Sequence, residues 1–315
     1  MKIAVIGNGA FGVKHLQALQ NIEEAEVVGI VGSRDESAKK TADEFGVKNY
    51  TGSLDKALEW DFDAAIIATP TQIHAEQAIK LMRAGKHVMI EIPMADDIKD
   101  AREIVKVQKE TGVVAMAGHT RRFNPSHQWI HNKITKGELN IQQMDVQTYF
   151  FRRTNTNALG EPRSWTDHLL WHHACHTVDL FAYQTGEEII DMNAIQGPIH
   201  PELGIAMDMS INLKSKSGAI CTLSLSFNND GPLGTFFRYI CDNGTYIARY
   251  DDLVDGYENP IDVSKVAVSM NGIELQDREF IAAIKEKREP NASVAQALSA
   301  MEVLNKLDQQ LNSKK

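Results

Sequence analysis

Short, continuous apolar runs alternate with amphipathic segments along the chain up to residue 117. Continuous apolar runs predict strands buried on both faces, and apolar residues at a spacing of three and four predict helices. The expected strands are Ile3–Ile6, Glu26–Val31, Ala64–Ala68, His87–Ile90 and Val113–Ala117. The expected helices are Val13–Gln20, Glu36–Phe45, Gln72–Ala84 and Asp97–Glu110. This alternation predicts an α/β architecture with a doubly wound parallel sheet.

The pattern changes after residue 118, where strand-like segments separated by Asn and Gly turns become dominant. We expect strands at Met144–Phe151, Ile189–Gln196, Ala206–Lys214, Ala219–Phe227, Thr235–Cys241 and Thr245–Tyr250. We expect helices at Pro125–Lys136, Trp171–Gln184, Leu275–Lys287 and Ser293–Leu311. Together they predict a C-terminal α+β domain with an open, mostly antiparallel sheet of roughly five or six strands.

Length and composition agree with two soluble domains. A chain of 315 residues corresponds to about two domains, which we place at 1–118 and 119–315, with C-terminal helices that could pack back on the first. The formal net charge of −9 argues against general binding to nucleic acids or anionic membranes. Three widely separated Cys residues predict reduced thiols in a cytoplasm. The chain has no apolar run of membrane-spanning length.

One segment departs from this acidic average. Between His119 and His176 there are seven Lys or Arg and four Asp or Glu, a net charge of +3, together with seven of the 11 His. A cationic, His-rich segment in an acidic chain indicates a site for an anionic small molecule.

A glycine-rich turn follows the first expected strand. Gly7-Asn8-Gly9-Ala10-Phe11-Gly12 is a G-x-G-x-x-G sequence between a strand and a helix, which is typical of a Rossmann dinucleotide site. Gly7 permits a tight turn, Gly9 lets a pyrophosphate approach, and Gly12 lets helix and strand pack closely. We expect the cofactor to contact this turn, including Ala10 and Phe11. A plain glycine turn is the alternative.

Two further strand ends contribute candidate cofactor contacts. After the second strand, Gly32 and Ser33 stand where NAD enzymes carry an acid, and Arg34 follows. The Ser33 hydroxyl and the Arg34 guanidinium suit a 2′-phosphate. We therefore expect NADP, with NAD as a weaker substitute, although the neighbouring Asp35 leaves NAD open. After the third main strand we expect contacts from Thr69, Thr71 and His74. Alternatively, Thr71 caps a helix and His74 faces solvent.

The order of three motifs resembles that of the glucose–fructose oxidoreductase/inositol dehydrogenase/rhizopine catabolism family. These motifs are the glycine turn, Ala68-Thr69-Pro70, and Glu91-Ile92-Pro93 in place of Glu-Lys-Pro. The resemblance implies cofactor contacts from Glu91, Ile92 and Pro93, and a homodimer formed through the C-terminal sheet. It places the family's Lys at Ile92, its catalytic His at His176, and the Asp of its Asp-x-x-x-His motif at His172.

Three longer stretches are similar to a branch of this family that degrades protocatechuate, a lignin-derived aromatic. They are Gly118–His127, Trp165–His173 and Ser226–Pro232. This resemblance implies NADP-dependent oxidation of a cyclic hemiacetal dicarboxylate to a lactone. A family dehydrogenase of another anionic sugar or hydroxy acid is one alternative. A non-catalytic NADP-binding regulator is another.

His172, His173 and His176 lie within one and a half turns of an expected helix. They could provide a general base, a zinc site or ordinary packing. We expect His176 to be the base, His172 to orient or bind the substrate, and His173 to contact it, with no metal ion. Substrate carboxylates are expected to bind arginines. Neighbouring residues on a strand point to opposite sides, so each Arg pair should supply one pocket residue. The candidates are Arg121, Arg122, Arg152 and Arg153, with Tyr149 and Arg163 as secondary ones.

Overall fold

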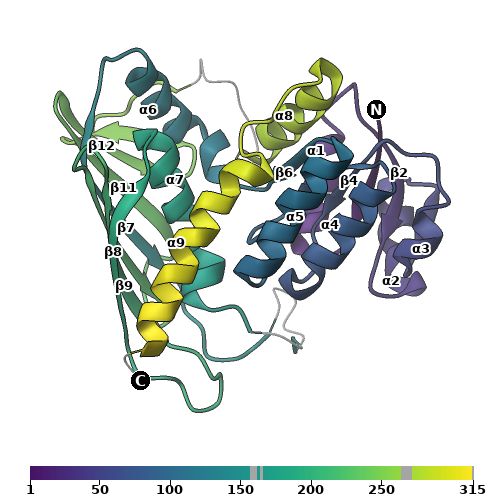
Figure 1. Cartoon of the computed structure of the whole chain (residues 1–315), viewed down its shortest axis with the longest axis horizontal. Coiled ribbons are helices and arrows are strands. Elements are labelled where there is room, and N and C mark those ends of the chain that lie inside the picture. The colour runs from purple at the N-terminus through teal and green to yellow at the C-terminus, as the bar shows by residue number, and fades with distance from the viewer. Residues whose placement is uncertain (157–161, 164–165, 264–271, 314–315) are drawn as a thin grey trace. The chain divides into compact units, whose positions relative to one another are not determined.

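The computed structural model describes residues 1–156, 162–163, 166–263 and 272–313. Contacts divide the chain into two compact units, coloured by residue number in Figure 1. The first unit is Met1–Thr120 with Ile273–Leu298, and the second is Arg121–Gly272 with Ser299–Lys315. Of the described helices, none is both long enough and apolar enough to cross a membrane. Trp165, part of one resemblance motif, lies outside the described residues.

The first unit contains a six-stranded sheet in the order β3-β2-β1-β4-β5-β6, and all its strands pair in parallel. Its strands are β1 (Lys2–Ile6), β2 (Glu26–Val31), β3 (Asn49–Thr51), β4 (Ala64–Ile67), β5 (His87–Ile90) and β6 (Ala115–Ala117). This confirms the predicted doubly wound parallel sheet. The strand order reverses at the β1/β4 boundary, and such a reversal is where dinucleotides bind in sheets of this kind.

Five helices of the first unit follow its strands: α1 (Ala10–Leu19), α2 (Asp35–Phe45), α3 (Leu54–Ala57), α4 (His74–Arg83) and α5 (Ile98–Thr111). The unit also contains α8 (Ile273–Glu286), from near the C-terminus. The first turn of α9 (Val294–Ser313) also belongs to this unit. A short 3-10 turn at Thr71–Ile73 precedes α4. Asp97 caps α5 by accepting a hydrogen bond from the Asp100 backbone N–H.

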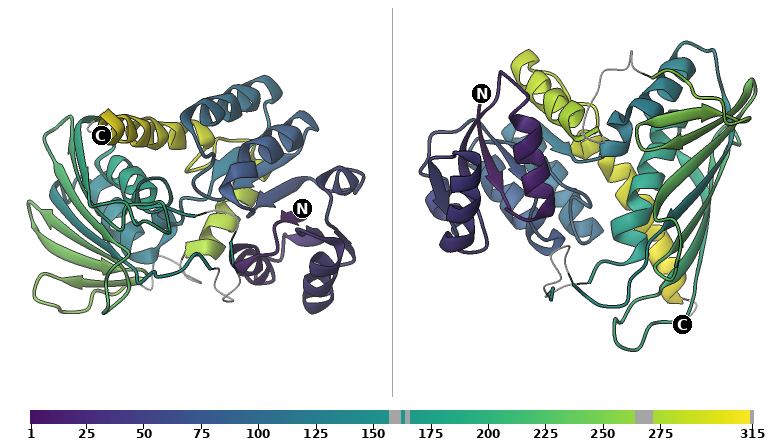
Figure 2. Two further views of the ribbon diagram at one scale, coloured as in Figure 1. Left: turned by 90° about the horizontal axis from the view of Figure 1, so that it is seen from below. Right: turned by 180° about the vertical axis from the view of Figure 1, so that it is seen from behind.

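The second unit contains a seven-stranded sheet in the order β13-β12-β11-β7-β10-β9-β8. Its strands are β7 (Ile141–Tyr149), β8 (Ile189–Gln196), β9 (Asp208–Ser215), β10 (Ile220–Ser226), β11 (Gly234–Cys241), β12 (Gly244–Arg249) and β13 (Asp252–Asp255). β7 and β10 are parallel and the other pairs are antiparallel, as predicted for a mostly antiparallel sheet. Figure 2 shows the helices of this unit against one face of the sheet.

The two faces of this sheet differ in side-chain character. Along β7, Met144, Val146 and Thr148 are buried, whereas Gln147 on the opposite face is exposed. The helices of the unit are α6 (Pro125–Thr135), α7 (Cys175–Thr185) and the rest of α9. The three cysteines, Cys175, Cys221 and Cys241, are free and buried.

The helix that carries the histidines is not the regular α-helix predicted over Trp171–Gln184. It begins two residues earlier, and Leu169–Ala174 form a π-helix before α7 starts. A π-helix bonds residues five apart instead of four, so each turn is wider. Such segments are frequent at functional sites.

Candidate functional site

The glycine turn has the geometry that its sequence predicts. Gly7 has φ +110°, and a Cβ there would lie 2.4 Å from the Ala68 carbonyl oxygen. A Cβ on Gly12 would lie 1.9 Å from the Gly7 carbonyl oxygen. Side chains at these two positions would therefore clash with the backbone of the unit itself.

Gly9 is different, because a Cβ there would meet nothing within 4 Å. Gly9 is the residue before α1, and its carbonyl oxygen accepts the Val13 N–H at 3.0 Å. Ala10 and Phe11 are exposed on the first turn. The fold thus leaves open space beside the helix N-terminus, where free N–H groups favour a phosphate. The residues present fit a dinucleotide pyrophosphate.

The end of β2 presents the two residues expected to face a 2′-phosphate. Ser33 and Arg34 are both exposed. The neighbouring Asp35 carboxylate accepts hydrogen bonds from the Gly52 N–H and the Thr51 hydroxyl. These bonds lower the pKa of Asp35, with the Gly52 bond as the main cause. Asp35 is therefore engaged with the segment after β3.

The chain just after β4 carries Thr69, Thr71 and His74. Of these, His74 contacts the loop after β5. The Thr69 hydroxyl donates to Gln77 at 2.7 Å, and Thr71 is buried at the start of the 3-10 turn. His74 is 1% exposed, so the solvent-facing alternative is wrong. Its ring nitrogens lie 2.9 Å from the Pro93 oxygen and 2.7 Å from the Thr69 oxygen. Burial lowers the pKa of His74.

Glu91, at the carboxyl end of β5, joins a buried cluster that sequence reasoning missed. Its Oε1 lies 2.9 Å from His15 Nε2, and His15 Nδ1 lies 2.9 Å from Asp277 Oδ1. Burial lowers the pKa of His15, but Asp277 and Glu91 outweigh it and raise the pKa to about 10. His15 lies on the core-facing side of α1. A histidine at a position predicted to face the core is the sequence feature that could have revealed this cluster.

The first arginine pair splits into two environments. Arg122 is buried and donates to both Asp179 oxygens, at 2.8 Å and 2.6 Å. It is a structural ion pair, which corrects its assignment as a substrate ligand. Arg121 has no carboxylate within ion-pair distance among the described residues. It lies over the Tyr250 ring at 4.8 Å, and donates weakly to Asn124 at 3.4 Å.

The second pair splits in the same way. Arg153 is exposed, lies over the Phe151 ring, and donates to the Arg152 backbone oxygen. Arg152 instead donates through Nη2 to Asp167 Oδ2 at 2.8 Å. Asp167 also contacts Arg163 at 3.0 Å and His173 Nε2 at 3.0 Å. Three cationic or titratable groups thus surround one carboxylate.

Asp167 is a residue of this site that the sequence did not single out. It is 7% exposed, and burial, which raises a carboxyl pKa, is outweighed by His173 and the two arginines, so its pKa is lowered. The His173 ring also packs against Phe150 at 4.9 Å and Phe227 at 5.2 Å. Asp167 therefore fixes His173 through Nε2. The sequence feature that could have identified Asp167 is its position as an acidic residue inside a cationic segment.

The remaining two histidines differ in how their ring nitrogens are placed. His172 Nδ1 accepts the His168 backbone N–H at 3.2 Å, so its proton sits on Nε2, which is buried. Burial lowers the pKa of His172 to about 3, so the ring is neutral at physiological pH. His176, in the first turn of α7, has a buried Nδ1. Among the described residues, no group of three or more His, Cys, Asp or Glu is arranged to hold a metal ion.

Tyr149 does not join these residues. Its hydroxyl donates to Ser224 at 3.1 Å, and Ser224 alternates with the buried Leu223 and Leu225 on β10. Tyr149 therefore lies on the face of the sheet opposite to the buried side chains. The next residue, Phe150, is the one that contacts His173.

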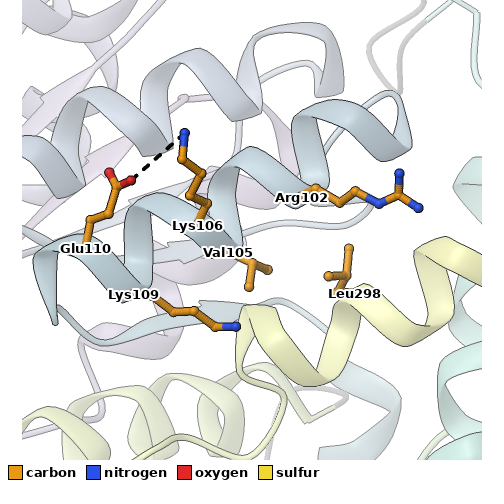
Figure 3. A pocket seen from close by; sticks show the side chains of 6 residues that line it. All are labelled: Arg102, Val105, Lys106, Lys109, Glu110 and Leu298. Atoms are coloured by element: carbon orange, nitrogen blue, oxygen red, sulfur yellow. Dashed lines mark ion pairs between the residues drawn. The ribbon is translucent and has the colours of Figure 1, made fainter.

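The first unit also has an open depression of about 500 Å³ on α5 and the start of α9 (Figure 3). Its lining side chains are Arg102, Val105, Lys106, Lys109, Glu110 and Leu298. Lys106 already pairs with Glu103 at 3.2 Å and Glu110 at 3.9 Å. No lining residue comes from the carboxyl ends of the strands, so this depression is separate from the candidate cofactor site.

Comparison with known proteins agrees with this geometry. Residues 1–119 match the model of an oxidoreductase family with an NAD-binding Rossmann fold, and residues 125–267 match one of bacterial oxidoreductases, C-terminal. The 4-carboxy-2-hydroxymuconate-6-semialdehyde dehydrogenase of Sphingobium sp. strain SYK-6 is 69% identical over 312 residues, covering 99% of each chain. A myo-inositol 2-dehydrogenase of Thermotoga maritima is 25% identical, covering 70% of this chain and 66% of that protein.

A solved structure shows the same fold at lower identity. The UDP-N-acetylglucosamine 3-dehydrogenase of Acidithiobacillus ferrooxidans aligns with a TM-score of 0.84 at 21% identity, covering 99% of this chain and 98% of that one. The chain therefore belongs to the glucose–fructose oxidoreductase/inositol dehydrogenase/rhizopine catabolism family of oxidoreductases.

Proposed function

We propose that this oxidoreductase converts the cyclic hemiacetal of 4-carboxy-2-hydroxymuconate-6-semialdehyde to 2-pyrone-4,6-dicarboxylate with NADP. The observation that carries this proposal is 69% identity, over 99% of each chain, to a dehydrogenase named for that semialdehyde. The first unit would be the cofactor domain, and the second the substrate and oligomerisation domain. The reaction belongs to protocatechuate breakdown.

The glycine turn and the ends of β2, β4 and β5 would hold the cofactor. Gly7 and Gly12 shape the turn, Gly9 leaves room for the pyrophosphate, and Ala10 and Phe11 flank it. Ser33 and Arg34 would bind the 2′-phosphate. Thr69 and the Glu91-Ile92-Pro93 loop would border the nicotinamide half, with Thr71 and His74 supporting them. The bound cofactor supplies a hydride acceptor.

Arginines of the second unit would bind the substrate carboxylates. Arg121 supports this role because no described carboxylate pairs with it. Arg152 and Arg163 share Asp167, which leaves positive charge in excess around that residue. Two separate cationic positions match a dicarboxylate.

His176 would remove the hydroxyl proton. Its Nδ1 is buried, so we assign Nε2 as the atom that accepts the proton. As the hemiacetal O–H bond breaks, its electron pair forms the lactone C=O bond. The hydrogen on the same carbon leaves with the C–H electron pair as hydride, which the oxidised nicotinamide would accept. Burial holds the pKa of His172 at about 3, so this ring stays neutral. His172 would orient neighbouring groups. His173, held by Asp167, would contact the substrate.

The test is NADPH formation with purified protein, the hemiacetal and NADP⁺, followed by absorbance. We expect turnover in the wild type and a loss of about 10²- to 10⁴-fold in kcat for His176→Asn, with unchanged thermal unfolding. Near-normal turnover in that variant would rule out the base. A wild type that binds NADP⁺ but turns over neither this hemiacetal nor related anionic hydroxy compounds would indicate a regulator instead.

We also propose a homodimer formed through the exposed face of the seven-stranded sheet, in the cytoplasm. That face carries Gln147, Tyr149 and Ser224 beside exposed residues such as Ile220, which supports packing against another sheet. The three free cysteines fit a reducing compartment. Light scattering after gel filtration gives the oligomeric state, and a monomer at micromolar concentration would contradict the dimer.

A further inference from the structure

The cluster of Asp277, His15 and Glu91 has no part in the proton transfer proposed above. His15 and Asp277 are completely buried, and the Glu91 side chain is 11% exposed. Of the three, only Glu91 reaches the surface. It does so directly after β5, at the carboxyl edge of the parallel sheet.

The cluster carries a net charge of −1. Carboxylate oxygens only accept hydrogen bonds, so each His15 nitrogen needs a hydrogen in its contact. One hydrogen lies between His15 Nδ1 and Asp277, and the other between His15 Nε2 and Glu91. If the second hydrogen sits on His15, an imidazolium lies between two carboxylates. If it sits on Glu91, a neutral His15 and a neutral Glu91 adjoin one carboxylate. The net charge is the same in both cases.

Among the described residues, the charged and titratable side chains near the cluster form no ion pair that neutralises this charge. Glu274, one turn from Asp277 on α8, already pairs with Arg278 at 2.6 Å. The ring nitrogens of nearby His74 contact the backbone oxygens of Pro93 and Thr69 instead of Glu91, and burial lowers the pKa of His74. The residue after Glu91 is the uncharged Ile92. A buried, uncompensated charge is unfavourable unless a partner of opposite sign approaches it.

The strand order shows which part of a dinucleotide would approach Glu91. The glycine turn follows β1, at the reversal point, and Ser33 and Arg34 follow β2. With the 2′-phosphate end of the cofactor at β2, the nicotinamide end would lie on the other side of the reversal, at β4 and β5. The oxidised nicotinamide ring carries a positive charge that it loses when it accepts hydride.

We propose that the Asp277–His15–Glu91 cluster makes the first unit bind the oxidised cofactor in preference to the reduced one. This inference rests on the proposed function, because it needs a nicotinamide cofactor at these strand ends. The buried negative charge stabilises the cationic ring and gives no such stabilisation to the neutral one. The cluster thus favours loading of NADP⁺ and release of NADPH, which is the direction of a catabolic oxidation.

The test measures the two dissociation constants, for NADP⁺ and for NADPH, by calorimetry without substrate. Asp277→Asn removes one negative charge at a buried position and keeps an oxygen that can accept the His15 Nδ1–H. We expect the ratio Kd(NADP⁺)/Kd(NADPH) to rise about tenfold relative to the wild type. Glu274→Gln is the matched control, since it removes an equal charge from the same helix at a site paired with Arg278. Its ratio should stay within about twofold of wild type.

Glu91→Gln provides a second route if Asp277→Asn does not fold. It removes the charge at the partly exposed end of the cluster and should shift the ratio in the same direction. An unchanged ratio in every folded variant, beside a wild type that binds both forms, would overturn the inference and leave the proposed function intact. A wild type that binds neither form would overturn both.

Discussion

Adjacent arginines of identical charge have different roles in this protein, because each points to a different environment. Arg122 forms a buried ion pair with both oxygens of Asp179, whereas Arg121 stacks over Tyr250 with no carboxylate partner among the described residues. Removing the arginine of a buried ion pair strongly destabilises the fold, because the remaining carboxylate is then a buried charge without a partner. An arginine without such a partner is available for a ligand.

Because the two environments differ, replacing each arginine by methionine should affect a different property of the protein. Arg121→Met should raise KM for the dicarboxylate about 10- to 100-fold, because a charged hydrogen bond is lost, and leave thermal unfolding nearly unchanged. Arg122→Met should lower the free energy of unfolding by about 3–5 kcal/mol. Steady-state kinetics and denaturant melts on both variants distinguish the two effects. If Arg122→Met were stable with a raised KM, the two roles would be reversed.

Arg34 is the residue expected to set cofactor choice. Its side chain is exposed at the end of β2, and the nearby Asp35 is occupied by Gly52 and Thr51. Arg34→Ala should lower kcat/KM for NADP⁺ about tenfold or more and change that for NAD⁺ little, because only NADP carries the 2′-phosphate. Equal losses with both cofactors would contradict this specificity role.

At the scale of elements, the turn between β1 and α1 combines two kinds of glycine. Gly12 is needed by the fold itself, since its Cβ position overlaps the Gly7 carbonyl oxygen. Gly9 has an ordinary φ of −76° and open space beside it, so the unit alone does not require glycine there. Under the proposed function, the requirement at Gly9 would come from the dinucleotide pyrophosphate.

Alanine substitutions separate these two requirements. Gly9→Ala should unfold at the wild-type temperature but bind the dinucleotide about tenfold more weakly, because the methyl group occupies the space for the pyrophosphate. Gly12→Ala should lose about 1–3 kcal/mol of stability through overpacking. Melting curves and titration with NADP⁺ give both quantities. Unchanged affinity in Gly9→Ala would mean that the phosphates lie elsewhere.

Elements with strong periodicity were predictable from the sequence, and short or irregular ones were not. The strands Glu26–Val31, His87–Ile90 and Ile189–Gln196 have the predicted bounds. By contrast, β3 has three residues and only one buried side chain, so it shows no apolar run. The π-helix escaped prediction because six residues cannot distinguish a spacing of four from one of five. The contacts of Asp167 could not be predicted from the sequence, because they depend on which arginine side chains face inward.

At the scale of the whole molecule, the first unit is discontinuous in sequence. Segment 273–298 packs with residues 1–120, and Asp277 reaches His15 across 262 positions of the chain. The contact joins α1 to α8 through buried charges. Its contribution to stability therefore depends on pH.

The sign of this dependence follows from the His15 pKa, which is raised to about 10 in the folded protein from about 6.5 in an unfolded chain. The stabilisation is fully present below about pH 6.5 and is lost as the pH rises towards 10, at up to about 1.4 kcal/mol per pH unit. Denaturant melts between pH 7 and 10 should show this decline. Asp277→Asn should flatten it, since a main cause of the raised pKa is removed. Parallel declines in both proteins would exclude His15 as the titrating group.

The discontinuous first unit also has a consequence for how the protein is made. Residues 1–120 leave the ribosome with the core-facing side of α1 uncovered and with His15 lacking its Asp277 partner. At roughly 5–20 residues per second, α8 follows about 10–30 s later. The nucleotide unit can therefore be completed only near the end of translation, after the polypeptide of the second unit has been synthesised. A premature stop anywhere before α8 would thus leave incomplete the unit whose first 120 residues are translated first.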